Sequence, residues 1–185
     1  RAAAALWELK RARDQLRHPV EVLGVLLADA TQLAAHTSLL AASRRAAPAA
    51  KQPLPQPPAW LTADYLQETQ QSVNERTGEL VSLLQAGVEG QSQRPAGPPT
   101  AQQQKEQAAS QRFLDMVRQA MPFLRQAVAS LEAAGDKLAS GKLDEAVEQQ
   151  FAAIASLQEA RERFLDLRGL IEWTYAREAQ IQDLL

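Results

Sequence analysis

The sequence predicts an all-α protein, an up-down antiparallel helical bundle of four to five long helices. Only 5% of the 185 residues are aromatic, and Ala, Leu and Gln stand where sheet proteins carry Val, Ile, Tyr and Phe. The chain is 45% hydrophobic and 23% charged, and it is long enough to bury a core. Two proline-rich stretches, 46–58 and 90–100, separate helical blocks. We therefore expect one helical-bundle domain over 1–185.

The two proline-rich linkers divide the expected bundle into an N-terminal helix and two helical hairpins. The N-terminal helix covers 1–17. Hairpin one covers 19–89 and contains the linker 46–58, and the linker 90–100 leads to hairpin two over 101–185. Proline lacks a backbone donor and does not fit helix interiors, so both linkers are predicted to be extended.

Local signals mark the helix ends in hairpin one. Pro19 suits the first position of a helix, and Glu21 in the first turn suits the helix dipole. This helix is predicted to run to about Arg45. Thr62 is a good N-cap for the next helix, which is predicted to last to about 87–90.

Hairpin two is predicted to begin with a capping box at 100–103. Its first helix ends near Ser140, and Pro122 inside it is expected to kink it or to split it in two. The residues 143–185 are then predicted to form one final helix roughly 60 Å long, with Gly169 as its weak point.

The corner of hairpin two carries the sequence GKLDEA at 141–146, followed by Ala153. This segment resembles the turn and second helix of a tetratricopeptide repeat, which implies a helical hairpin of the kind found in peptide-binding arrays. An array would repeat after about 34 residues, and no second copy occurs at that period. The alternative is a tight corner between two antiparallel helices.

A longer internal echo occurs at an offset of 80 residues and includes a glutamine in both copies. Its 4-3-4-3-4 spacing places all members of a copy on one helix stripe. The echo favours two related hairpins, although any two bundle helices share this period. Glutamines in such stripes form either polar core layers or exposed positions. The copies are Leu66, Gln70, Val73, Thr77, Leu80 and Leu84, and Ala146, Gln150, Ala153, Leu157, Ala160 and Phe164.

The residues give no pattern for catalytic, cofactor-binding or metal sites, and we expect a non-enzymatic protein without a cofactor. The chain has no cysteine, and it lacks the His-Glu-x-x-His, Gly-x-Ser-x-Gly and phosphate-loop motifs. Its two histidines, His18 and His36, are too far apart along one helix to share a metal ion. A net charge of −2 offers no basic field for nucleic acid, which we exclude as a partner.

The end of the final helix is the predicted partner-binding surface. This helix is expected to extend past its neighbours, where an aromatic side chain has little intramolecular core to enter. Packing against the N-terminal helix, through Leu6, Leu9 and Leu16, is the alternative. The predicted partner-binding residues are Leu170, Ile171, Trp173, Tyr175, Ile181 and Leu184.

We expect a protein–protein interaction or scaffold module that binds a protein partner, or a second copy, through apolar helix faces. The bias toward Ala, Gln, Arg and Leu is typical of bacterial proteins. No run reaches the roughly 18 apolar residues that span a bilayer, so a membrane tether would lie outside this sequence. We expect the periplasmic side of the cell envelope, with the cytoplasm as the alternative.

Two other function classes stay open. One is a sensory bundle that binds a small ligand in a cavity near the Pro122 kink, lined by Met116, Met121 and Phe123. The other is an amphipathic helix that binds a lipid surface reversibly.

Overall fold

The computed structural model describes residue 10 and residues 19–46, 57–91 and 101–165. Within these ranges the secondary structure is helical and contains no strand, which confirms the all-α prediction. The helices are α2 (Pro19–Ala46), α3 (Ala63–Gln91), α4 (Ala101–Ala139) and α5 (Leu143–Glu162).

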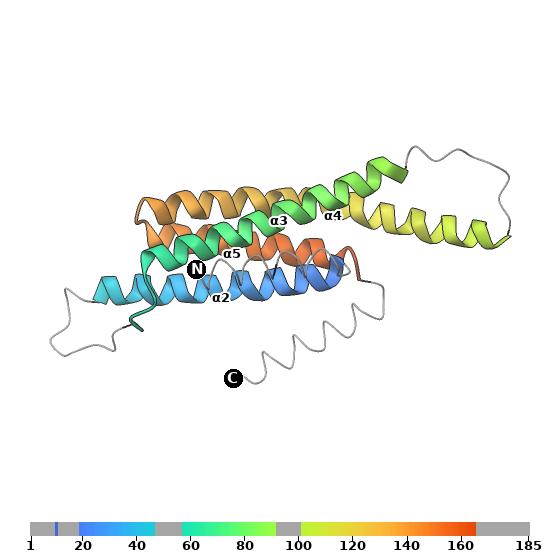
Figure 1. Cartoon of the computed structure of the whole chain (residues 1–185). Helices are drawn as coiled ribbons and strands as arrows, with labels where there is room; N and C mark the ends of the chain where they lie inside the picture. Colours follow the sequence, from blue (N-terminus) through green and yellow to red (C-terminus); the bar gives the residue numbers. More distant parts are fainter. Residues whose placement is uncertain (1–9, 11–18, 47–56, 92–100, 166–185) are drawn as a thin grey trace, which may run out of the picture.

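Consecutive helices run in opposite directions and form an up-down four-helix bundle (Figure 1). α2 packs against α3 and α5, and α4 packs against the same two helices. α3 and α5 therefore occupy opposite corners of the ring of helices. This arrangement matches the predicted antiparallel bundle.

The helix ends of hairpin one lie where the local signals predict them. α2 begins at Pro19, as predicted, and ends one residue beyond Arg45. The Thr62 hydroxyl accepts a hydrogen bond of 3.1 Å from the Tyr65 N–H, which is the predicted N-cap of α3. These signals are short-range and do not depend on the rest of the fold.

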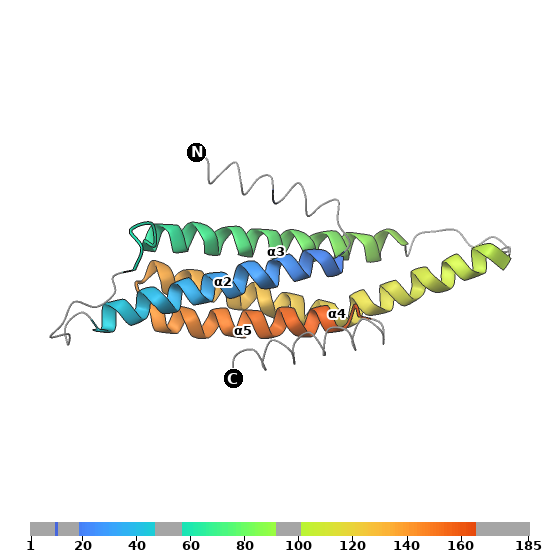
Figure 2. The ribbon, with the colours of Figure 1, turned by 90° about the horizontal axis from the view of Figure 1, so that it is seen from below.

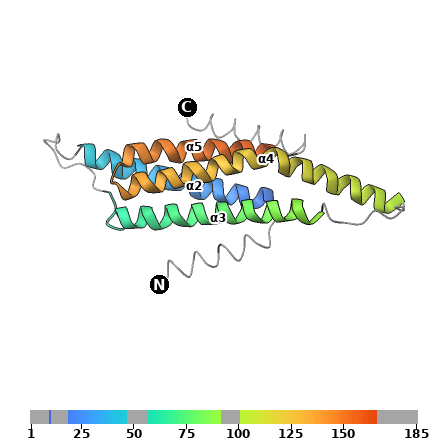
Figure 3. The ribbon, with the colours of Figure 1, turned by 90° about the horizontal axis from the view of Figure 1, so that it is seen from above.

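α4 remains one continuous helix through Pro122. The helix bends partway along its length (Figure 3), as expected for a helix with an interior proline, which cannot donate to the carbonyl one turn earlier and whose ring crowds that turn. Of the two outcomes predicted for Pro122, the structure shows the kink and not the split. The first part of α4 extends past the end of α5 (Figure 2).

The core contains both stripes of the echo, and every one of their residues is buried. Buried residues of α2 also match buried residues of α4, at an offset of 98 residues. This offset is larger than 80 because the connection between α2 and α3 is longer than that between α4 and α5. The duplication of a hairpin stays a prediction. The sequence match between the two hairpins now covers the first helix of each as well as the second. The matched positions, all of them buried, are Leu23 and Met121, Leu26 and Leu124, Leu33 and Leu131, and Leu40 and Leu138.

The prediction of one continuous helix over 143–185 is wrong, because α5 ends at Glu162. The N–H of Phe164 donates to the Arg161 carbonyl at 3.0 Å, and the N–H of Leu165 donates to that of Glu162 at 3.2 Å. These three-residue bonds tighten the chain into a turn. The buried Phe164 ring lies 6.3 Å from the Phe113 ring between centroids, so a contact with α4 holds this turn.

The corner between α4 and α5 is a tight turn between two antiparallel helices. Gly141 has a φ of 72°, and its N–H donates to the Leu138 carbonyl at 2.9 Å. The Lys142 N–H donates to the Lys137 carbonyl at 2.9 Å, which completes a Schellman cap. Lys137 also donates to Glu145 at 2.6 Å. This hydrogen bond lowers the pKa of the Glu145 carboxyl and raises the pKa of the Lys137 amine.

Replacing Gly141 by alanine should destabilise the bundle by about 1 kcal/mol, because a side chain is strained in the left-handed region. The matched control is Gly78→Ala in α3, where an added Cβ meets nothing within 4 Å. That control should raise stability by about 0.5 kcal/mol through its helix propensity. Urea unfolding measures both variants, and equal effects of the same sign would contradict the cap.

Candidate functional site

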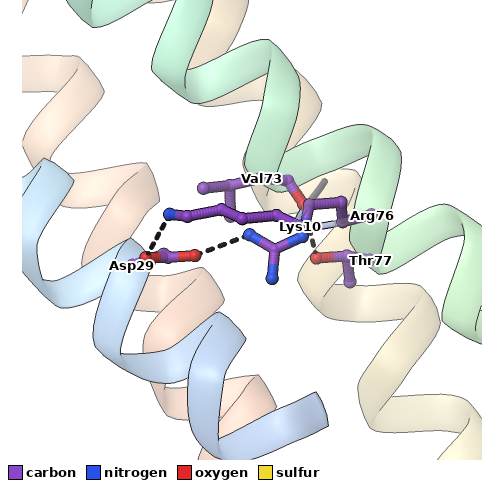
Figure 4. A network of polar contacts seen from close by, with 5 residues as sticks. All are labelled: Lys10, Asp29, Val73, Arg76 and Thr77. Carbon is purple, nitrogen blue, oxygen red and sulfur yellow. Dashed lines mark hydrogen bonds and ion pairs between the residues drawn. The ribbon is translucent and has the colours of Figure 1, made fainter. Parts of the chain in front are cut away.

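A partly buried charge network joins α2 to α3 (Figure 4). One Asp29 oxygen accepts from Lys10 at 3.0 Å, and the other accepts from Arg76 at 2.6 Å. The Arg76 side chain is only 1% exposed. Because both Asp29 oxygens are engaged within the protein, this network binds the helices together and presents no open reactive group.

A pair of glutamines forms a polar layer across the core. The Gln150 amide donates to the Gln70 carbonyl oxygen at 2.9 Å, and the Gln70 amide donates to the Leu131 backbone carbonyl at 2.8 Å. Gln70 and Gln150 are 2% and 1% exposed. They are the matched glutamines of the echo, and they meet from opposite corners of the bundle. Of the two readings of these glutamines, the polar core layer is correct for this pair.

His36, the histidine within the described residues, belongs to an aromatic cluster at the end of the bundle where α2 connects to α3. The His36 ring lies 5.1 Å from the Trp60 ring and 6.0 Å from the Tyr65 ring, between centroids. No group of three or more His, Cys, Asp or Glu side chains in the described ranges is close enough to hold a metal ion. His36 therefore has aromatic neighbours and no ligand set around it.

The residues predicted to line a ligand cavity near the Pro122 kink pack into or against the core. Met121 is buried, and Met116 and Phe123 are partly buried against the same core cluster. A pocket of about 320 Å³ lies elsewhere, between α3 and α4. We call this pocket the α3–α4 groove.

The outer side of α2 carries no charge over most of its length. We define the α2 outer face as its exposed residues between Glu21 and Arg44. Leu39, at 48% exposure, is its largest apolar side chain. Five of its residues follow the 4-3-4-3 spacing of a helix-packing seam, although this side faces solvent. The α2 outer face comprises Ala28, Thr31, Gln32, Ala35, Leu39 and Ala42.

Sequence reasoning did not identify the α2 outer face. A usable signal was present, since Asp29 is the only charged residue between Glu21 and Arg44. For the same reason α2 is the one helix in the described ranges long and apolar enough to cross a membrane, by length and composition alone. Its contacts with α3 and α5 make it a core helix of this bundle.

The predicted partner-binding surface lies outside the described residues, as does the N-terminal helix apart from Lys10. The six residues from Leu170 to Leu184 therefore stay a prediction, and so does their pairing with Leu6, Leu9 and Leu16.

No known protein family matches the chain, and neither does any curated protein or solved structure. The likeness of 141–146 to a tetratricopeptide repeat thus remains local. What the structure shows there is one turn between α4 and α5.

The substitution Asp29→Ala should destabilise the bundle by about 3 kcal/mol, because the buried Arg76 guanidinium loses its carboxylate partner. Asp144→Ala is the matched control, since its ion pair with Arg45 is exposed and should be worth about 0.5 kcal/mol. The double variant Asp29→Leu with Arg76→Met should recover much of the loss. Urea unfolding measures all three, and similar costs for Asp29→Ala and Asp144→Ala would refute the structural role of the network.

Proposed function

We propose that this chain is a non-enzymatic interaction module, which binds a helix of a protein partner or of a second copy along the α2 outer face. The observation that carries the proposal is the uncharged outer side of α2. A helix that packs only on its inner side normally carries charged residues on its solvent side. α2 instead exposes four apolar residues, a threonine and a glutamine between Glu21 and Arg44.

The spacing of these residues favours a helical occupant. Ala28, Gln32, Ala35, Leu39 and Ala42 lie on one stripe, and the alanines allow close approach of another helix. The exposed Leu39 side chain can insert between residues of the facing helix and bury apolar surface there.

The interior supports a structural role for the buried polar groups. Gln70 bonds to Gln150, and Asp29 bonds to Arg76, each within the bundle. Groups engaged in this way hold the scaffold rigid and leave recognition to its surface. A larger, membrane-tethered bacterial assembly in the cell envelope is the proposed setting, and a free cytoplasmic adaptor is the alternative.

A photo-crosslinking side chain placed at position 39 of the full-length gene product tests the proposal in intact host cells. We expect discrete crosslinked products from position 39, because this side chain would lie within the interface. Position 83 is the matched control, since Leu83 is a comparably exposed leucine, at 55%, on α3. Leu39→Glu should abolish the complex and leave the urea midpoint nearly unchanged.

Two results would contradict this proposal. The first is the absence of products from position 39, and the second is the same set of products from positions 39 and 83. Fractionation of the same cells tests the setting. Recovery in the membrane fraction is expected for a tethered module, and recovery in the soluble fraction would favour the cytoplasmic adaptor.

A further inference from the structure

The side of α5 that lies next to α2 extends the α2 outer face onto a second helix. α2 packs against α5, and the exposed Arg45 of α2 forms an ion pair of 3.2 Å with Asp144 of α5. These two residues therefore mark the facing flanks of the two helices. Residues spaced by three and four positions from them share the same flanks. On α2 they include Ala35 and Ala42, two exposed members of the α2 outer face.

Phe151 is the largest exposed apolar side chain on this side of α5, at 56% exposure. It follows Asp144 by two helical turns and so lies on the flank that faces α2. Leu39 precedes Arg45 by about the same distance along the antiparallel helix α2, roughly 10 Å at 1.5 Å per residue. Leu39 and Phe151 thus stand at one level of the bundle. Because a helix is about 10–12 Å across, one helix on the α2 outer face can contact both.

The α5 flank is acidic on both sides of its apolar centre. Glu148 lies one turn before Phe151, and Glu162 lies two turns after the exposed Ala155. Neither carboxylate forms an ion pair within the described part of the chain. α2 carries no lysine or arginine over most of its length. We define the α2–α5 strip as Ala35 and Ala42 of α2 with Glu148, Phe151, Ala155 and Glu162 of α5.

We propose that the partner of the α2 outer face is a basic amphipathic helix, which also binds α5 along the α2–α5 strip. This inference rests on the proposed function and adds to it the second helix of the surface and the charge of the partner. The apolar stripe of the partner packs on the small alanines and on the Phe151 ring. Its lysine or arginine residues pair with Glu148 and Glu162 at the two ends of the strip.

The charge of the strip argues against two other occupants. The α2 helix of a second copy carries no lysine or arginine between Glu21 and Arg44, so it offers no cation along its outer face. An anionic lipid surface attracts lysine and arginine and is repelled by carboxylates such as those of Glu148 and Glu162. A basic helix of another protein suits both the apolar centre and the acidic ends.

The test compares photo-crosslinking from positions 39 and 151 of the full-length gene product in intact host cells. A photoreactive phenylalanine derivative replaces Phe151, and position 83 on α3 is again the control. We expect the same partner product from positions 39 and 151, because one helix touches both. A product from position 39 that position 151 does not give would overturn the α2–α5 strip and leave the α2 interface standing. The absence of products from position 39 would overturn both proposals.

Mass spectrometry of the crosslinked segment tests the charge of the partner. We expect a segment with apolar residues at helical spacing and with lysine or arginine on both sides of them. A segment without an excess of basic residues, or α2 of a second copy, would overturn the proposal.

Charge-neutral variants test the acidic ends of the strip. The double variant Glu148→Gln with Glu162→Gln should lower the crosslinking yield from position 151 about fivefold, because two exposed ion pairs with the partner are lost. The matched control is Glu132→Gln with Asp136→Asn, which removes the same charge from exposed residues of α4. It should leave the yield nearly unchanged. Equal losses from both double variants would show that overall charge, and not the strip, attracts the partner.

Discussion

The hydrogen bond between Gln70 and Gln150 is the constraint on which the alignment of the bundle depends. It joins α3 to α5 across the core, and Gln70 also bonds to the α4 backbone at Leu131. A shift of any one of these helices by a turn would leave a buried amide without a partner, at about 1–3 kcal/mol. Apolar stripes of leucine and alanine tolerate such a shift far better. The glutamines thus select one register among several that the hydrophobic pattern allows.

A fixed register matters because the α2 outer face and the α3–α4 groove are each built from more than one residue along a helix. The α2 outer face keeps its orientation relative to the bundle because Asp29, on the same helix, forms an ion pair with Arg76 of α3. The α3–α4 groove keeps its two walls at one level because Gln70 bonds to Leu131 between them. Internal polar contacts therefore position external surfaces of different chemistry, one uncharged and the other lined by amides and carboxylates.

The sequence predicted those features that local signals determine. Pro19 and Thr62 mark helix starts through their own backbone and hydroxyl chemistry, and the 4-3 spacing predicts which residues of α3 and α5 are buried. The end of α5 was missed because contact between Phe164 and Phe113 of another helix holds the turn. Periodicity also could not pair Gln70 with Gln150, since it places each on a helix stripe without saying which helices face each other. The groove depends on the same three-dimensional neighbourhood, as Asn74 and Asp136 are far apart along the chain.

The most direct test of this account is a double-mutant cycle of Gln70→Leu and Gln150→Leu, followed by urea unfolding and amide NMR spectra. Each single variant should lose about 1–3 kcal/mol, because the remaining amide is buried without its partner. The double variant should regain stability and yet show several sets of signals, as expected when helices adopt more than one register. Single variants that lose no stability, or a double variant with one native-like spectrum, would contradict the claim that this pair sets the register.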